Sequence, residues 1–350
     1  MTNIIFIFMG MNKRRVLLYP FALIYWGITS IRNKFFDWGV LPTYKIQFPS
    51  VGVGNLTTGG TGKSVVVDYL ISNFKKDFRI AVLSRGYGRM LKGVQIADEK
   101  STATTIGDEP VQFYSKHQDI EVVVAEKRIL GLKKIEKLPS KVNLLILDDI
   151  LQHRYVKPTT LVLTTTYDTP YVSDALLPSG NLRESKSGAQ RADIVLVTKC
   201  PEKLTVQQLK FFEERLNLLP QQKIFFTRIK YSSTVQNALT KKSLTKLKSP
   251  FLLVTGIADP TPLEAYLKSL GLDFIHFSFP DHHTFTFQDI TKLKKAQREG
   301  DILTTEKDYM RLYPALQYDN LFYIPIEMAF LDAAMELEFK DFIKGKIISN

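Results

Sequence analysis

The glycine-rich segment GNLTTGGTGKS, residues 54–64, carries the strongest chemical signal in the sequence. It follows an apolar run and precedes a helical pattern, so its backbone N–H groups can surround phosphate oxygens at a helix N-terminus. In such a loop the lysine reaches the terminal phosphates of a nucleotide and the serine hydroxyl binds Mg²⁺. Strict spacing asks for glycine where this chain has Thr57, and we expect the glycines that follow to supply the flexibility. The expected nucleotide contacts are Asn55, Thr58, Gly59, Gly60, Thr61, Gly62, Lys63 and Ser64.

Two adjacent carboxylates, Asp148 and Asp149, end the apolar run LLILDD at 144–149. Acidic residues at the tip of a buried strand are where a P-loop enzyme holds magnesium. An ordinary turn after a strand is the alternative interpretation. Together with the upstream P-loop, the pattern predicts a Mg²⁺ site made of Ser64, Asp148 and Asp149.

The segment GDEP at 107–110 places Asp108 at an expected helix start. Asp108 could cap that helix, or it could act as general base toward an acceptor hydroxyl, which requires a partner that orients it. The segment PDHH at 280–283 offers His282 or His283 as that partner, and solvated loop histidines are the alternative.

Two further segments bear on specificity. LLPSGNLRES, residues 176–185, has the composition of a loop, and its Arg183 and Glu184 could bind a phosphorylated or polyhydroxy substrate. VTKC, residues 197–200, lies where a guanine-specific GTPase carries a lysine followed two residues later by aspartate. Pro201 stands at that last position, which favours ATP over GTP.

From about residue 46 onward, short apolar runs alternate with helical patterns. Such alternation predicts an α/β fold of the P-loop NTPase type, with a doubly wound, mostly parallel sheet. Near residue 220 the chain becomes basic before the strand–turn–helix pattern resumes, which indicates a second, smaller α/β lobe. We therefore expect three regions, an N-terminal helix region at 1–45, a nucleotide-binding core at 46–220 and a smaller lobe at 221–350. Helices are expected at 107–117, 126–137, 204–218 and 287–298.

The apolar run VLLYPFALIYWGI, residues 16–28, lies between two groups of basic residues. A bilayer-spanning helix needs about 20 apolar residues, so this run predicts a helix lying at a membrane interface. A buried N-terminal helix is the alternative. The segment 3–9 lacks a cleavage site and precedes the basic cluster, so no signal peptide is expected.

Overall charge and cysteine content narrow the class of protein. The formal net charge of +12 suits an anionic partner such as nucleotide phosphates, nucleic acid or an acidic membrane surface. The basic stretch 229–248 contains one aromatic residue, Tyr231, on which a base could stack, so no nucleic-acid partner is expected. Cys200 is the only cysteine, which excludes an intrachain disulfide and fits a reducing cytoplasmic setting.

Taken in order, these segments resemble the tetraacyldisaccharide 4'-kinase family, the lipid A kinases of Gram-negative envelopes. The resemblance extends from about residue 12 to residue 310, and its ordered set is more specific than any single piece. The segments that carry it are VGNLTTGGTGKS, SRGYGR (84–89), GDEP, DDILQHR (148–154), LPSGNLRES, VTKCP, FPDHHTF (279–285) and TTEKD (304–308).

The resemblance implies transfer of the ATP γ-phosphate to the 4'-hydroxyl of a tetraacyldisaccharide 1-phosphate. It implies a protein that associates peripherally or monotopically with the cytoplasmic face of the inner membrane, and we expect a monomer. By its motifs Asp108 is the base, His282 its partner with His283 as second choice, and Lys63 completes the catalytic set. Further matches lie near nucleotide (Arg128) or substrate (His153, Arg183, Glu184 and, as the second histidine, His283).

One departure from the family pattern follows the acidic pair. The family commonly has a small residue and phenylalanine there, whereas this chain has Ile150 and Leu151, and Ile150 could crowd the metal side of the loop. The alternative function is a P-loop GTPase or metallochaperone-like hydrolase without a lipid acceptor.

Overall fold

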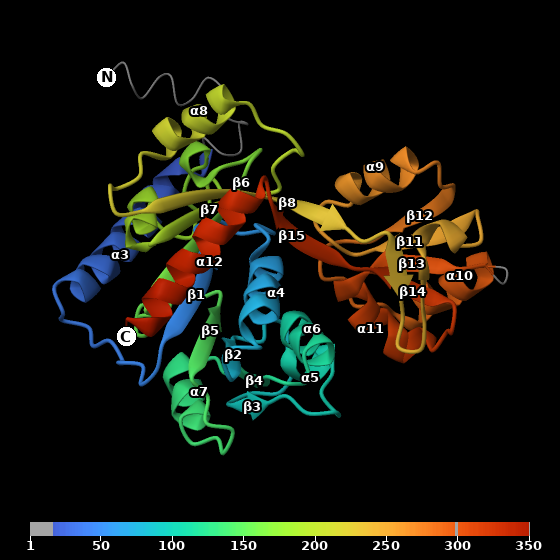
Figure 1. Ribbon diagram of the computed structural model, residues 1–350, viewed down its shortest axis with the longest axis horizontal. Coiled ribbons are helices and arrows are strands. Elements are labelled where there is room, and N and C mark those ends of the chain that lie inside the picture. The colour runs from blue at the N-terminus through green and yellow to red at the C-terminus, as the bar shows by residue number, and fades with distance from the viewer. Residues whose placement is uncertain (1–16, 298–299, 350) are drawn as a thin grey trace. The chain divides into compact units, whose positions relative to one another are not determined.

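The structure is a computed structural model that describes residues 17–297 and 300–349. The chain divides into two compact units, each assembled from separate stretches of sequence (Figure 1). The expected regions, with boundaries at residues 45 and 220, are each one continuous stretch of sequence, and this division stays a prediction. The first unit comprises Met1–Arg85, Lys127–Arg228 and Ala329–Asn350, and the second comprises Gly86–Glu126 and Ile229–Met328.

The N-terminal helix α3 (Tyr19–Asp37) is longer than the apolar run that predicts it. Pro20 stands in its first turn, where proline is tolerated, and the helix continues nine residues beyond Ile28. Gly39, with φ of 71°, follows its end. None of the helices at 17–297 and 300–349 has the length and apolarity needed to cross a bilayer. The segment 3–9 and the basic residues Lys13, Arg14 and Arg15 lie outside the described residues.

Six parallel strands form the centre of the first unit. Strands β1, β2, β5 and β7 are buried along their whole length, as expected for a sheet covered on both faces. Val53 pairs with Asp148 and with Val162, so the acidic pair lies beside the strand that enters the glycine-rich turn. In spatial order the strands are β8 (Lys223–Tyr231), β7 (Ile194–Thr198), β6 (Thr160–Thr166), β1 (Ser50–Asn55), β5 (Leu144–Asp148) and β2 (Ile80–Ser84).

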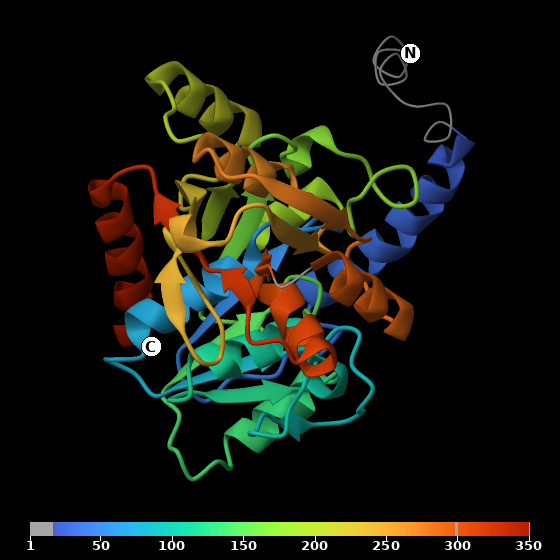
Figure 2. The same cartoon turned by 90° about the vertical axis from the view of Figure 1, so that its right-hand side faces the viewer.

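Helices α4 and α12 of this unit lie side by side, as both views show (Figures 1 and 2). The Tyr69 ring of α4 lies 6.1 Å from the Phe339 ring of α12, and its hydroxyl donates a 2.8 Å hydrogen bond to Glu336. The helical elements here, besides α3, are α4 (Lys63–Phe74), α7 (Arg128–Ile135), η1 (Tyr171–Ser173), η2 (Lys186–Arg191), α8 (Val206–Leu216) and α12 (Ala333–Ile348).

The second unit contains its own six-stranded sheet. The last four strands of its spatial order pair in parallel, and two short antiparallel strands extend one edge. The order is β10 (Lys241–Ser243), β9 (Thr234–Gln236), β14 (Leu321–Ile324), β13 (Ile302–Thr305), β11 (Phe251–Thr255) and β12 (Phe274–Ser278).

Helices cover both faces of this sheet (Figure 1). Leu253 of β11 packs with α9 (Thr261–Ser269), whereas its neighbours Leu252 and Val254 pack with α10 (Phe287–Gln297) and α11 (Glu306–Leu316). The other elements of this unit are β3 (Gln95–Ile96), α5 (Ala103–Ile106), α6 (Asp108–Lys116), β4 (Glu121–Val124) and η3 (Leu244–Lys246). Strand β15 (Ile326–Phe330) begins in this unit and ends in the first. The predicted mostly parallel α/β fold is confirmed.

Candidate active site

The turn between β1 and α4 has the geometry of a phosphate-binding loop. Gly59 has φ of 114° and Gly62 has φ of 82°, backbone conformations that other residues rarely adopt. Gly62 is the N-cap residue of α4, so Lys63 and Ser64 are the first two residues of the helix. The predicted strand–turn–helix context is therefore present, and the N–H groups of Lys63 and Ser64 at the start of α4 lie where anions bind.

Thr57 occupies the position at which the strict motif has glycine. It forms an isolated bridge with Leu182 and does not belong to the described non-glycine residues with positive φ. The loop that contains Arg183 therefore lies against the phosphate loop, and the Arg183 backbone N–H donates to Leu56 at 2.7 Å. The Arg183 side chain reinforces this contact, because its Nε donates to the Thr57 carbonyl at 3.2 Å.

Four polar side chains converge beside the turn. Lys63 Nζ donates to Asn55 Oδ1 at 3.1 Å and lies 3.5 Å from Asp149 Oδ1. Arg183 holds the same carboxylate with two hydrogen bonds, from Nη1 to Oδ2 at 3.0 Å and from Nη2 to Oδ1 at 2.9 Å, and Nη2 also contacts Asn55 Oδ1. The cluster brings together Lys63, Asn55, Asp149 and Arg183, which were predicted for three different roles.

Asp149 is held in its ionised form by these neighbours. Burial by itself would raise its pKa, but the hydrogen bonds from Arg183 and the charges of Lys63, Arg183 and Arg128 outweigh burial and hold the pKa well below its usual range. Its φ of 49° turns the chain sharply after β5, so its carboxylate faces Arg183.

Asp148 lies one residue earlier, at the end of β5, and has a different environment. Its side chain is almost fully buried and accepts a 2.8 Å hydrogen bond from Ser84 Oγ. Arg128, which begins α7, donates from Nη2 to the Asp148 backbone carbonyl at 3.0 Å. Among the residues that the structure describes, no group of three or more His, Cys, Asp or Glu side chains forms a metal site.

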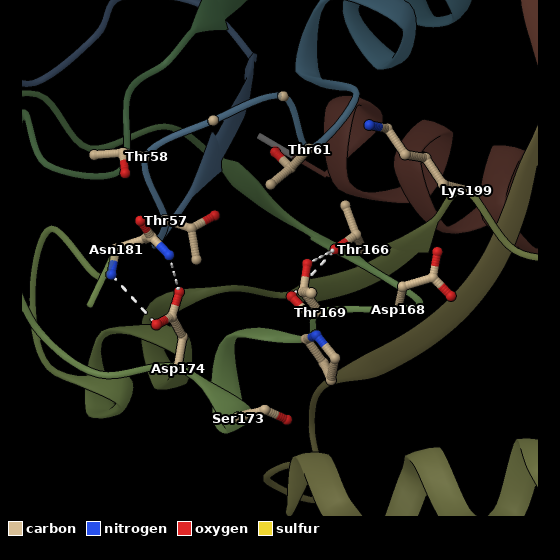
Figure 3. Close-up of a pocket in the computed structure, with 13 residues that line it drawn as sticks. Thr57, Thr58, Thr61, Thr166, Asp168, Thr169, Ser173, Asp174, Asn181 and Lys199 are labelled. Atoms are coloured by element: carbon tan, nitrogen blue, oxygen red, sulfur yellow. Dashed lines mark hydrogen bonds between the residues drawn. The ribbon is translucent and has the colours of Figure 1, made fainter. Parts of the chain in front are cut away.

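A pocket of about 360 Å³ opens beside the phosphate loop, and four of the predicted nucleotide contacts line it (Figure 3). Next to Thr57, Asp174 accepts a 2.8 Å hydrogen bond from the Asn181 side chain, as a dashed line in Figure 3 marks. The lining residues are Thr57, Thr58, Gly59, Gly60, Thr61, Thr166, Asp168, Thr169, Pro170, Ser173, Asp174, Asn181 and Lys199.

His153 is partly buried in the first unit. Burial, with the nearby charge of Arg128, lowers its pKa to about 4. The imidazole is therefore neutral at pH 7, with one ring nitrogen that donates a hydrogen bond and one that accepts. Its predicted contact with substrate stays a prediction.

Glu184 is fully buried, although it belongs to a segment with the composition of a loop. Its Oε1 accepts hydrogen bonds from Arg191 at 2.8 Å and from Gln152 at 3.1 Å, and its Oε2 accepts one from Asn33 of α3 at 2.8 Å. In this structure the carboxylate joins α3 to the loop that carries Arg183. Its predicted role in substrate binding stays a prediction.

Ile150 and Leu151 pack against β1. An added Cβ on Gly52 would lie 2.7 Å from the Ile150 Cγ2 methyl, and one on Gly54 would lie 2.6 Å from Leu151 Cβ. The buried Ile150 side chain therefore packs against β1 at Gly52, which lies two residues before Gly54, the first glycine of the phosphate loop.

Asp108 and His282 contact each other within the second unit, although 174 positions separate them in the sequence. His282 Nδ1 and Asp108 Oδ2 are 3.1 Å apart. The hydrogen bond to Asp108 raises the pKa of His282 above its usual value. Asp108 begins α6 after Gly107, whose φ of 101° favours glycine.

His283 points to a different carboxylate. Its Nε2 lies 3.0 Å from Asp289 Oδ2, and its ring stacks on Phe279 with a centroid separation of 4.7 Å. The sequence left open which histidine would meet Asp108, and the structure brings His282 there. His283 as a substrate contact stays a prediction.

One side chain at Asp108 was not predicted. Arg311 Nη1 lies 3.5 Å from Asp108 Oδ2, and Arg311 also pairs with the buried Asp308. The segment TTEKD, which contains Asp308, belongs to the ordered motifs, and Arg311 follows three positions later on the helix that the segment begins. A basic residue one helical turn after the aspartate of this motif was the available signal.

Comparison with known proteins supports the family resemblance that the sequence motifs indicate. The family model for tetraacyldisaccharide-1-P 4'-kinase matches residues 14–346. The chain belongs to the tetraacyldisaccharide 4'-kinase family. A curated tetraacyldisaccharide 4'-kinase of Flavobacterium johnsoniae is 43% identical over 92% of this chain and 94% of that protein, and one of Bacteroides thetaiotaomicron is 37% identical over 95% and 93%.

A solved member of the tetraacyldisaccharide 4'-kinase family has the same fold. The "apo" form of LpxK from Aquifex aeolicus in complex with ATP is 29% identical, with a TM-score of 0.75 over 95% of this chain and 99% of that chain. The predicted family and the predicted enzyme class, a kinase, are confirmed. The alternative of a nucleotide hydrolase without a lipid acceptor is not favoured.

Proposed function

We propose that this chain transfers the γ-phosphate of ATP to the 4'-hydroxyl of tetraacyldisaccharide 1-phosphate, with Mg²⁺ as cofactor. The observation that carries the proposal is the 3.1 Å contact between Asp108 and His282 in a chain of this family. A carboxylate oriented by an imidazole can serve as the general base for an alcohol acceptor, as the catalytic aspartate of protein kinases does.

The nucleotide side of the reaction is assigned to the first unit. The N–H groups at the start of α4 and the Lys63 ammonium would bind the phosphates, and the pocket that Thr58 and Thr61 line would take the remainder of the nucleotide. Lys63 is held by Asn55 and Asp149 in this structure. Its ammonium would exchange those contacts for charge-assisted hydrogen bonds to phosphate oxygens.

The predicted magnesium ligands offer oxygen atoms only, which fits Mg²⁺. Ser64 stands at the first turn of α4, and Asp148 is the buried carboxylate at the end of β5. Asp149 fits this task less directly, because both of its oxygens are bound by Arg183. Mg²⁺ held by these residues would supply positive charge that offsets the negative charge of the phosphoryl group.

The acceptor side is assigned to the second unit. His282 uses Asp108 Oδ2, and among the described residues no hydrogen bond to Oδ1 is present. Oδ1 would therefore receive the proton of the 4'-hydroxyl. The sugar oxygen forms a bond to the γ-phosphorus, the bond from phosphorus to the bridging oxygen breaks, and ADP leaves. His282 keeps the carboxylate in place during the transfer.

The lipid would be presented at a membrane surface that α3 contacts. Several large apolar side chains of this helix are exposed, among them Phe21, Ile24 and Ile28. Exposed apolar and aromatic residues beside basic ones are typical of helices that lie in the headgroup region. We propose peripheral association with the cytoplasmic face of the inner membrane, as a monomer without a nucleic-acid partner.

A phosphate-transfer assay tests the proposal. Purified protein in mixed micelles receives γ-labelled ATP, Mg²⁺ and tetraacyldisaccharide 1-phosphate. We expect a labelled bisphosphorylated lipid that is nearly lost in His282→Asn. His276→Asn is the matched control, because His276 also pairs with a carboxylate of this unit, Glu264 at 3.0 Å. Phosphate release without labelled lipid would instead support a hydrolase.

Membrane association has a separate test. The double variant Phe21→Ser, Ile24→Ser should sediment less with vesicles that contain anionic lipid. Leu239→Ser removes an equally exposed side chain in the second unit and serves as control. Equal sedimentation of the α3 variant and the wild type would exclude α3 as the membrane contact.

A further inference from the structure

The guanidinium of Arg311 lies against the carboxylate of the proposed base. Nη1 is 3.5 Å from Asp108 Oδ2, the same oxygen that His282 Nδ1 approaches to 3.1 Å. Arg311 belongs to α11 and Asp108 to α6, and both helices lie in the second unit. Asp108 therefore has a cationic side chain and an imidazole on one oxygen.

Arg311 is itself held in place by Asp308. The two side chains form an ion pair one helical turn apart, and Asp308 is fully buried. Arg311 Nη2 also donates to the Gly256 backbone carbonyl at 3.2 Å. The guanidinium thus cannot swing away from Asp108 without breaking a buried ion pair, which is costly to separate.

The same Asp308 fixes the turn that carries His282. Asp308 Oδ2 accepts hydrogen bonds from the Gly256 N–H at 2.8 Å and from the Thr305 hydroxyl at 2.7 Å. The Gly256 carbonyl in turn accepts from the His282 N–H at 3.1 Å. Asp308 therefore connects to both partners of Asp108, to Arg311 directly and to His282 through Gly256.

One nitrogen of Arg311 faces Asp108 without a hydrogen bond to the described part of the chain. Arg311 Nη1 is buried, and among the described residues it has no hydrogen-bond partner. Its closest approach to a carboxylate outside its own ion pair is the 3.5 Å contact with Asp108. Hydrogen bonds in catalytic sites are often long before the substrate binds, and they tighten in the reactive complex.

We propose that Arg311 is a positioning residue for Asp108, and that Asp308 sets the positions of both Arg311 and His282. The imidazole of His282 and the charge of Arg311 both act on Oδ2 and restrain the carboxylate, so that Oδ1 is presented to the acceptor hydroxyl. This inference rests on the proposed function, because it assigns Arg311 to the group that removes the acceptor proton.

The test compares three variants of the full-length protein in the phosphate-transfer assay. Arg311→Met removes the charge and both donors but keeps most of the side-chain volume, and Arg311→Lys keeps the charge. Lys242→Met is the matched control, because Lys242 Nζ pairs at 2.9 Å with the buried Asp301 of the same unit, far from Asp108 in sequence and without contact to it. Both Met variants leave a buried carboxylate without its cation.

A positioning role predicts a specific kinetic pattern. Arg311→Met should lower kcat by about 10–100-fold, since small displacements of a catalytic group have effects of this size. The KM for ATP should stay unchanged, because the nucleotide is assigned to the other unit. Arg311→Lys should be faster than Arg311→Met. Lys242→Met should lower the thermal unfolding midpoint as Arg311→Met does, while its kcat stays near that of the wild type.

Asp108→Asn separates failure of this inference from failure of the proposed function. Full activity in Asp108→Asn would remove Asp108 as the base, and the proposed mechanism would fail first. If Asp108→Asn is impaired, Arg311→Met should add no further loss in that background, because Arg311 acts through the Asp108 carboxylate. Losses that multiply, or a kcat of Arg311→Met equal to that of Lys242→Met, would overturn the inference.

Discussion

Asn33 of the N-terminal helix donates a 2.8 Å hydrogen bond to the carboxylate of Glu184, which is fully buried. Glu184 directly follows Arg183, whose guanidinium holds Asp149 beside the phosphate loop. A second contact lies next to it, because the Tyr25 hydroxyl donates to the Arg183 carbonyl at 2.7 Å. Helix α3, the proposed membrane helix, is therefore hydrogen-bonded to Arg183 and Glu184, in the loop that lies against the phosphate loop.

This relationship makes Glu184 a residue on which stability depends. Arg191→Met removes the cation from a fully buried carboxylate and should lower the free energy of unfolding by roughly 3–5 kcal/mol. Lys223→Met removes one partner of an exposed ion pair with Glu338 and should change the free energy of unfolding by less than about 1 kcal/mol. Urea unfolding followed by intrinsic fluorescence measures both. Similar effects of the two variants would mean that Glu184 does not depend on Arg191.

The glycines of the β1 strand and of the loop differ in the space around them. A Cβ at Gly54 would lie 2.6 Å from Leu151 Cβ and 2.9 Å from its backbone nitrogen, whereas a Cβ at Gly60 would meet nothing within 4 Å. Gly54→Ala should therefore destabilise the protein by roughly 1–3 kcal/mol or more, as overpacked cores do. Gly60→Ala should leave the thermal unfolding midpoint almost unchanged. A Gly54→Ala protein as stable as the wild type would show that the strand and the Leu151 turn can separate.

Lys63 and Asp108 act on different parts of the proposed reaction. A general base contributes typically about 10²–10⁴-fold, so Asp108→Ala should lower kcat by an amount in this range. Lys63→Ala should cost more, because the lysine both binds the nucleotide and stabilises charge on the transferred phosphoryl group. Initial rates of lipid phosphorylation at saturating lipid rank the two variants. An equal or inverted ranking would contradict this division of roles.

The pair formed by Asp108 and His282 should make stability depend on pH. The hydrogen bond to Asp108 raises the pKa of His282 above its ordinary value of 6.5, with Asp281 and Glu109 adding to the effect and burial and Lys307 opposing it. A raised pKa in the folded state stabilises the protein when the imidazole is protonated. This contribution is complete below the ordinary value and is lost as the pH rises through the raised one.

The corresponding measurement compares the wild type with His282→Gln. The difference between their urea unfolding midpoints should be larger at about pH 5.5 than at about pH 8.5. His276→Gln provides the reference for a histidine of the same unit that does not contact Asp108. A difference that stays constant across this pH window would show that the hydrogen bond does not favour the protonated imidazole.

Local sequence determined much of this protein. The glycines at 59 and 62 and the apolar runs around them identify a strand, a turn and a helix, because backbone torsion preferences and side-chain periodicity act over a few residues. The helix starts at Lys63 and Asp108 were predictable for the same reason. The ordered motifs further identified the family, which the comparisons confirm.

Tertiary structure alone decided which side chains meet. His282 was expected to meet Asp108, with its neighbour His283 as second choice, and the structure turns His282 to Asp108 and His283 to Asp289. His282 has φ of 56° in this turn. The sequence likewise left Arg311 unremarked and placed Glu184 in a polar loop. Each of these outcomes depends on contacts between segments far apart in the chain, and such contacts are set by how helices and sheets pack rather than by the preferences of neighbouring residues.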